Sequence, residues 1–435
     1  MNTNHKRGRT GLKGMALAVL ALLFLLPSSA TGQELIRECN VKGEPSLVRA
    51  CSENVWMVYY EDGFGPTFAK VTSTGATADN ICLYGLIAHV ADFEIVNNIL
   101  YFCGTSLSNT AVMGYFSLTN FPSTLVYTCT VPLIGNCRKL EAGYFNGTRH
   151  VLMIGDALGT SHIIDARDMG SNQWNFNIST YSDNDDFYDD VAVTDNYVVV
   201  SARNVAGNTA RLYRFDQPAA NSPLLPQINI PYMIPNHSCQ GEVLLDECVG
   251  DTIAYLTRTS STGFAVGICS MPGNFQTCHI RLASNTNPFE LKDIKYNASV
   301  RRADAMMYDL ANGSTSIFHI THPIISVGIF PWVTSYSYTG HLFNNQKLLS
   351  LDALGNGRFI ASGSGFNENG LLDLNKYIYD TWLLCFNSTL ITMTVPKFPK
   401  THDIKEQLLS SNYQATAQST YCMSNEIDVT TECQQ

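Results

Sequence analysis

Short apolar runs recur along this chain with nearly constant spacing. Seven of them share one style, a β-branched or aromatic run bounded by polar turn residues: VWMVYY from Val55, ILYFCG from Ile99, VLMIGD from Val151, YVVVSA from Tyr197, IAYLTR from Ile253, AMMYDL from Ala305 and FIASGS from Phe359. Their starts lie 44, 52, 46, 56, 52 and 54 residues apart. A period near 50 residues is typical of repeat architectures in which each unit is one supersecondary motif.

Each unit resolves into short strands separated by turn signals. The second unit reads DFEIV, ILYFCG, AVMGYFSL and TLVYTCTV, and the fourth reads DVAV, YVVVSA, RLYRFD and PQINI. Between the strands stand VNN, TDN and NVAGN, whose Asn, Asp and Gly favour tight turns. The second strand is apolar throughout, which indicates burial on both faces. The third alternates, as in RLYRFD, which indicates one solvated face.

Four strands per unit at this period predict an all-β fold, a β-propeller of seven four-stranded blades over residues 33–400. Six or eight blades also fit the pattern. The unit repeats because one blade cannot bury its own two faces and needs a copy on each side. Residues 401–435 are predicted to form a C-terminal extension with a short helix around DIKEQLLSS and a pair of cysteines.

The well-known propeller signatures do not occur in the sequence: no Trp-Asp dipeptide ends a strand, and neither a double-glycine kelch motif nor a sialidase box is present. In spacing, ADFEIVNNILYFCG at residues 91–104 resembles the repeats of uncharacterised secreted β-propeller-like proteins of Bacteroidales-type bacteria. The resemblance extends through the repeat style of most of the mature chain. It implies a propeller fold but no activity, and it carries no functional residue onto this chain.

The N-terminus has the features of a signal peptide over residues 1–32. Its apolar core, Met15–Leu26, is 12 residues long, whereas a membrane-spanning helix needs about 20. Small residues, PSSATG, follow it, and basic residues precede it: Lys6, Arg7, Arg9 and Lys13. We therefore expect an exported protein in the periplasm, at the cell surface or outside the cell, with no transmembrane segment after cleavage.

The charge balance excludes one class of partner. The chain carries 27 basic and 37 acidic side chains, for a net charge of −10. Since the signal segment holds four basic and no acidic residues, the mature chain has a net charge of −14. Nucleic-acid binding depends on Lys and Arg that neutralise phosphates, so we expect no nucleic-acid partner.

All 13 cysteines lie in the mature chain, and disulfides are the expected state in an exported protein. No CxxC motif points to zinc instead. The simplest interpretation pairs near neighbours, so that each bridge closes a hairpin or turn: Cys39–Cys51, Cys82–Cys103, Cys129–Cys137, Cys239–Cys248, Cys269–Cys278 and Cys422–Cys433. Cys385 is left over and is predicted to be a buried thiol.

An acidic residue stands at the beginning of the first strand in several units: Asp92, Glu141, Asp190 and Asp246. Two interpretations are open. The four side chains could form a ring of acids at the mouth of a central channel. Alternatively, each carboxylate accepts backbone N–H bonds at a turn, as Asp commonly does.

The most charged stretch is YSDNDDFYDD, residues 181–190. Asp183, Asp185 and Asp186 could supply hard oxygen ligands to Ca²⁺, which is the one cofactor that the sequence offers. The stretch departs from an EF-hand loop, because Tyr188 stands where that loop needs Gly and Thr194 where it needs Glu. A solvated acidic connection between blades is the alternative.

No HExxH, GxSxG or phosphate-cradling glycine loop occurs in the sequence. Because binding residues often sit on loops over a rigid scaffold, we expect a non-catalytic binding or scaffolding module for a protein or glycan partner. The alternative is a polysaccharide hydrolase or lyase with acidic residues in the central funnel. Such an enzyme needs two carboxylates roughly 5–10 Å apart, and the sequence singles out no pair.

Overall fold

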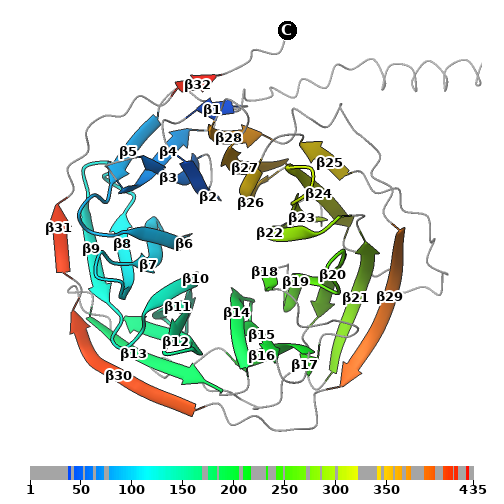
Figure 1. Ribbon diagram of the computed structural model, residues 1–435. Coiled ribbons are helices and arrows are strands. Elements are labelled where there is room, and N and C mark those ends of the chain that lie inside the picture. The colour runs from blue at the N-terminus through cyan, green and yellow to red at the C-terminus, as the bar shows by residue number, and fades with distance from the viewer. Residues whose placement is uncertain are drawn as a thin grey trace, which may run out of the picture.

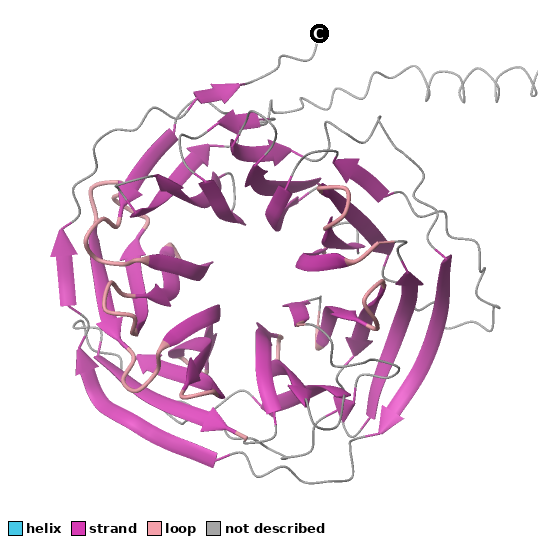
Figure 2. Ribbon diagram, viewed as in Figure 1, coloured by secondary structure: helices cyan, strands magenta, loops and turns pink. Residues whose placement is uncertain are grey.

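The computed structural model describes the following residues: 38–40, 44–51, 54–61, 65–72, 78–168, 175–183, 186–204, 209–216, 232–233, 242–247, 250–270, 275–284, 287–298, 302–321, 340–343, 347–355, 358–364, 369–373, 387–396, 405–414, 416–419 and 428–430. The regular elements in these segments are β-strands (Figure 2). None of the described residues belongs to a helix long and apolar enough to cross a membrane. The predicted signal peptide lies outside the described residues.

The described strands form seven antiparallel sheets that stand in a ring, in chain order, each with its first strand innermost (Figure 1). This is the arrangement of a β-propeller-like fold, as the sequence predicts. The innermost strands are β2 (Glu44–Cys51), β6 (His89–Val96), β10 (Asn136–Phe145), β14 (Asp186–Val193), β18 (Val243–Glu247), β22 (Phe289–Asn297) and β26 (Lys347–Gly355).

Each sheet continues outward in hairpin order. The second strands are β3 (Asn54–Glu61), β7 (Ile99–Thr105), β11 (Thr148–Ala157), β15 (Tyr197–Asn204), β19 (Thr252–Arg258), β23 (Arg302–Asp309) and β27 (Arg358–Ser364). The third strands are β4 (Gly65–Thr72), β8 (Ala111–Ser117), β12 (Thr160–Asp168), β16 (Thr209–Asp216), β20 (Gly263–Ser270), β24 (Ser314–Thr321) and β28 (Asn369–Asp373). Each of the seven apolar runs that define the period begins in a second strand.

The fourth strands are β5 (Ala78–Cys82), β9 (Leu125–Thr130), β13 (Asn175–Ser182), β17 (Tyr232–Met233), β21 (Phe275–Ser284) and β25 (Gly340–Phe343). In the last sheet this place is taken by β1 (Glu38–Asn40), which pairs with β28. The ring is therefore joined by strands from opposite ends of the described chain.

The burial of the strands matches the prediction in part. The second strands β7, β15 and β19 are buried over almost their whole length, as their apolar runs indicate. The predicted solvated face of the third strand holds only in part, since β8 and most of β16 are buried, while Arg214 and Asp216 of β16 are half-buried. Neighbouring sheets cover both faces of these strands, and the charged Arg211 of β16 is buried because its guanidinium binds Asp186 at 2.6 Å.

Clusters of buried apolar side chains fill the space between neighbouring sheets. Leu152 of β11, for example, packs in one cluster with Val198 and Val200 of β15 in the next sheet. Trp56 of β3 and Phe102 of β7 belong to another such cluster. Full burial of a large apolar side chain contributes about 1.5–3 kcal/mol, so these contacts between sheets supply much of the stability of the ring.

The C-terminal segment runs around the outside of the ring and adds an outermost strand to four sheets (Figure 1, orange and red). The added strands are β29 (Asn387–Pro396) on β21, β30 (Lys405–Gln414) on β13, β31 (Thr416–Ser419) on β9 and β32 (Asp428–Thr430) on β1. The predicted helix around DIKEQLLSS is wrong, because the described part of this stretch, residues 405–411, is in β30. The unpaired backbone groups of β13 outweigh the local helix propensity of Lys, Glu, Gln and Leu.

Candidate functional site

Within the described residues, a β-bulge interrupts the ladder between the first two strands in six of the seven sheets. A bulge re-aims the side chains beside it. The residue directly after the bulge is polar or charged in five of the sheets: Asp92, Lys139, Asp190, Asp293 and Ser350. Two positions further along stand Glu94, Glu141, Lys295 and Asp352, and Arg49 has this place in β2.

Within the described residues, inner-strand carboxylates join five of the seven sheets to the next one. Asp92 Oδ2 accepts the backbone N–H of Leu140, at 3.1 Å, from the neighbouring inner strand. The same bond recurs at 2.5–2.9 Å around the ring: Asp190 to Leu245 N, Asp246 to Tyr296 N, Asp293 to Leu351 N, and Asp352 to Ala50 N. Asp92, Asp190 and Asp246 therefore accept backbone N–H groups, as one of the two interpretations proposed, but from the next sheet and not at a turn.

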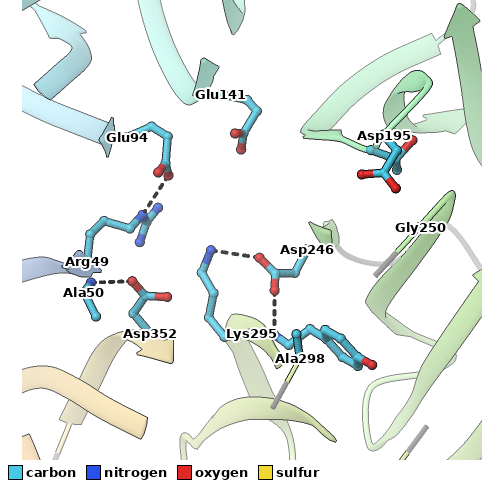
Figure 3. Close-up of a pocket in the computed structure, with 12 residues that line it drawn as sticks. Arg49, Ala50, Glu94, Glu141, Asp195, Asp246, Gly250, Lys295, Ala298 and Asp352 are labelled. Carbon is cyan, nitrogen blue, oxygen red and sulfur yellow. Dashed lines mark hydrogen bonds and ion pairs between the residues drawn. The ribbon is translucent and has the colours of Figure 1, made fainter. Parts of the chain in front are cut away.

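A cavity of about 480 Å³ lies at the centre of the ring, and every one of the seven sheets contributes to its wall (Figure 3). It is lined by Arg49, Ala50, Glu94, Glu141, Thr194, Asp195, Asp246, Gly250, Lys295, Tyr296, Ala298 and Asp352. Five carboxylates and two cations thus face one space. Of the four acids singled out by the sequence, Glu141 and Asp246 line this cavity, while Asp92 and Asp190 do not.

The two cations of the wall are held by carboxylates. Arg49 binds Asp92 at 2.6 Å through Nη2 and lies 3.5 Å from Glu94 through Nε. Lys295 Nζ lies 2.9 Å from Asp246 Oδ1. Burial alone would lower the pKa of the Lys295 ammonium, but Asp246 and other acids of the ring have the larger combined effect, so the pKa is raised. The pKa of Arg49 is raised for the same reason. Both side chains therefore stay protonated.

Burial raises the pKa of two acids in the cavity wall. It raises the pKa of Asp246 to about 6, although the Lys295 ammonium beside it favours the ionised form. Burial also raises the pKa of Glu94, against the effect of Arg49. These carboxylates stand in a site that excludes water from part of their surface, and such shifted groups are typical of functional sites but also of structural ion-pair networks.

The calcium candidate takes a different form from the predicted one. Asp186 is buried at the start of β14, where Arg211 Nη1 binds its Oδ1 at 2.6 Å, Asn204 Nδ2 donates to Oδ1 at 2.9 Å, and the Tyr213 hydroxyl donates to Oδ2. Asp183 is buried too, and Asp185 lies outside the described residues. No three His, Cys, Asp or Glu side chains gather at a potential metal site in the described part of the chain.

The alternative of a solvated acidic connection is wrong for the described part of this stretch. Asp189 and Asp190 are buried with Asp183 and Asp186. Asp189 binds the Arg203 guanidinium at 2.6 Å and accepts the backbone N–H of Val243 at 3.1 Å. Burial raises the pKa of Asp189 to about 7, with Arg203 acting against it. Arginine partners in the neighbouring strands compensate the burial of these charges, and a single sequence does not reveal such pairing.

Three of the predicted disulfides are not formed. The structure has thiols at Cys51, Cys82, Cys103, Cys129 and Cys137, which excludes Cys39–Cys51, Cys82–Cys103 and Cys129–Cys137. Proximity along the chain does not decide the pairing, because Cys82 and Cys103 lie in different sheets, as do Cys129 and Cys137, and the packing between sheets sets the distances between the thiols. Cys269 is disulfide-bonded, and Cys278 lies directly opposite it in the β20–β21 ladder.

The remaining cysteine predictions concern positions of which less is described. Outside the described residues lie Cys239, Cys248, Cys385, Cys422 and Cys433, and of Cys39 only the backbone is described, in β1.

Several wall residues were not singled out by the sequence: Arg49, Glu94, Asp195, Lys295 and Asp352. A signal was present. The first strands carry triplets with an apolar residue between two polar ones, of which the second polar residue lines the cavity: DFE at 92–94, KLE at 139–141, DIK at 293–295 and SLD at 350–352. Aligning the units on these triplets, and not on the acid alone, would have found most of the wall.

Comparison with known proteins adds little beyond the fold. No protein-family model matches the sequence, and no curated protein matches it. Among solved structures, the chain is similar to one from a structural and mechanistic analysis of two prolyl endopeptidases, with 10% sequence identity and a TM-score of 0.39. The match covers 92% of this chain and 55% of that one, so this chain spans about half the length of that protein.

Proposed function

We propose that the protein is an exported β-propeller of seven blades that acts as a non-catalytic binding or scaffolding module. Its partner is a protein or glycan, which places a polar group in the central cavity. One observation carries the proposal: the cavity of about 480 Å³ has a wall of charged side chains drawn from all seven sheets. The seven sheets, with β1 completing the last, support the blade number.

The wall is organised for binding, because several of its charges are fixed before any partner arrives. Asp246 is held by Lys295 and by the backbone N–H of Tyr296, and Asp352 accepts the N–H of Ala50. Such side chains lose little conformational freedom when a ligand enters, and preorganisation of this kind favours affinity. With five carboxylates and two cations in the wall, neutral or cationic groups are preferred over anionic ones.

The second candidate is a polysaccharide hydrolase or lyase that uses the same cavity. Its support is the raised pKa of two wall acids, about 6 for Asp246 and a shift in the same direction for Glu94. A carboxyl with a pKa near neutrality can donate a proton as a general acid, while a second carboxylate acts as base or nucleophile. Against this candidate, both oxygens of Asp246 already accept hydrogen bonds from Lys295 and Tyr296.

One experiment separates the two. The mature protein is run on native gels that contain a neutral, an anionic or an amino-sugar polysaccharide, and the release of reducing ends is assayed on the same samples. We expect retardation by the neutral or amino-sugar polymer without release. Glu141→Gln should reduce retardation, whereas Glu290→Gln, which changes a half-exposed acid outside the cavity wall, should not.

Three other results of these assays would each contradict part of the proposal. If the wild type releases reducing ends and Asp246→Asn does not, the protein is a polysaccharide hydrolase or lyase and the non-catalytic binding module is contradicted. Retardation that Glu141→Gln leaves unchanged would remove the cavity from the proposal. An absence of both retardation and release would contradict the glycan and leave a protein partner, to be sought with the wild-type chain and Glu141→Gln as matched baits.

A further inference from the structure

A group of sulfur-containing side chains lies between the β6–β9 sheet and the β10–β13 sheet. It consists of three thiols, Cys103, Cys129 and Cys137, with the thioethers of Met113 and Met153. All of them are buried, with exposed fractions between 0% and 5%. The cavity and its charged wall include none of these residues.

Cys103 and Cys137 belong to one buried cluster at the boundary between the two sheets. Cys103 is in β7 and Cys137 is near the start of β10, and these strands are in contact. Cys137 is one of the groups that raise the pKa of the Cys103 thiol, after burial itself. The Cys137 thiol donates to Met153 Sδ at 3.9 Å. Two thiols in one buried cluster, on strands that contact each other, meet the first requirement for a disulfide, which is proximity.

The surrounding structure holds the two strands together at this point. Cys103 lies opposite Asp92 in the β6–β7 ladder, and Asp92 Oδ2 accepts the backbone N–H of Leu140 on β10. Cys129 is placed less favourably. It lies on β9, separated from Cys103 by Met113 of β8, which is the cross-strand partner of both.

We propose that Cys103 and Cys137 form a disulfide that joins the two sheets when the chain folds in the presence of a thiol–disulfide oxidant. The oxidant is a small-molecule or protein disulfide. Each cysteine loses a proton and one electron as the S–S bond forms, and the oxidant's disulfide takes up both electrons and both protons to become two thiols. The flexible, polarisable side chains of Met113 and Met153 can adapt to the shorter contact. The proposal is independent of any ligand in the cavity.

The burial of the thiols determines at which stage of folding the disulfide can form. Burial and the nearby Cys137 raise the pKa of the Cys103 thiol well above its usual value, and burial raises that of Cys129 to about 12. The thiolate is the species that attacks a disulfide, so the folded, reduced protein reacts slowly. The bond therefore forms while the two sheets are still assembling.

The test compares the full-length mature protein refolded in a glutathione redox buffer with the same protein refolded under reductant. Remaining thiols are alkylated in denaturant, and the chain is digested with pepsin at acid pH. Tryptic cleavage is unsuitable, because no Lys or Arg lies between Lys70 and Arg138 and one peptide would hold all these cysteines. We expect a linked peptide pair containing Cys103 and Cys137, with Cys129 alkylated.

Variants make the assignment specific. Cys129→Ser should keep the linked pair, and Cys103→Ser and Cys137→Ser should each lose it. The oxidised wild-type chain should melt roughly 5 °C above the oxidised Cys137→Ser variant, whereas oxidised Cys129→Ser should melt close to the wild type; the Cys269 disulfide is intact in all three. Alkylation of both Cys103 and Cys137 in the oxidised wild-type protein, or a link from Cys137 to Cys129, would overturn the proposal without recourse to any variant.

Discussion

At the scale of single residues, the ring depends on charged side chains that are buried and compensated. Asp92 is the clearest case. Its Oδ1 accepts the N–H of Phe93 and binds Arg49, while its Oδ2 accepts the N–H of Leu140 from the next sheet. One carboxylate thus satisfies a backbone group in each of two sheets and a buried guanidinium, so its loss leaves several polar groups without a partner.

We expect Asp92→Ala to destabilise the protein by about 3–5 kcal/mol, because it leaves the buried charge of Arg49 with one partner fewer and the N–H of Leu140 without an acceptor. Asp79→Ala is the control, since Asp79 is an exposed acid on β5, and surface changes of this kind stay within about 0.5 kcal/mol. Urea unfolding of both variants gives the comparison. Equal stabilities would mean that the bonds between inner strands contribute nothing.

The titration of Asp246 gives a prediction for pH. Its pKa is raised to about 6 in the folded protein from an ordinary value of 3.8, so between these values the folded state keeps a proton that the unfolded state releases. The stabilisation is full below pH 4 and is lost as the pH rises through 6, by roughly 3 kcal/mol. The melting temperature of the wild type relative to Asp246→Asn should therefore fall between pH 4 and pH 7. Parallel curves would show that Asp246 has an ordinary pKa.

At the scale of secondary structure elements, a glycine on one strand lies opposite a large buried aromatic residue on the neighbouring strand in two of the sheets. Phe102 of β7 lies opposite Gly114 of β8, and Tyr255 of β19 lies opposite Gly267 of β20. In each pair the aromatic ring occupies the space beside the glycine, and a Cβ on Gly114 would come within 2.0 Å of the Phe102 ring. The glycines therefore allow the buried rings to lie flat along the sheet.

We expect Gly114→Ala to cost about 1–3 kcal/mol through overpacking, since Phe102 is fully buried and cannot move aside freely. Gly135→Ala is the matched change, because the nearest atom to its Cβ would be at 3.5 Å, an ordinary contact. Thermal unfolding followed by near-UV circular dichroism measures both. A Gly114→Ala protein as stable as Gly135→Ala would show that the Phe102 ring has room to shift.

At the scale of the whole molecule, the chain protects the rim of the ring with its own C-terminal segment. The outer strands β9, β13, β21 and β1 each gain a hydrogen-bonded neighbour from residues 387–430. Open sheet edges pair readily with other chains, so this segment both joins several sheets and shields their edges.

A chain that ends at residue 386 should therefore melt at a lower temperature and self-associate. The removed strands β29 and β30 leave the edges of β21 and β13 without partners. Light scattering across a concentration series and a melting curve at the lowest concentration separate the two effects. A truncated chain that stays monomeric with an unchanged melting temperature would contradict this role for the segment.

Much of the architecture follows from sequence periodicity alone. The apolar run of each unit, such as YVVVSA, occupies a second strand in the structure, because only a strand covered on both faces tolerates so continuous an apolar stretch. The alternation in RLYRFD predicts a solvated Arg211, whereas this side chain is buried against Asp186. Local pattern reports the hydrophobicity of a side chain, whereas burial of a charge depends on a partner elsewhere in the chain.

The central cavity likewise combines features that the sequence determines with features that only the tertiary structure decides. The sequence by itself determined the repeat, the strand order within each unit and the presence of acids in the first strands, because period and hydrophobicity are local properties. Only the tertiary structure decided that Glu141 and Asp246 share a cavity with Lys295 and Arg49, which lie in four different sheets. It also decided that Cys103 belongs to one buried cluster with Cys137 and is not bonded to Cys82. Ring closure sets these distances, and no local signal in the sequence records them.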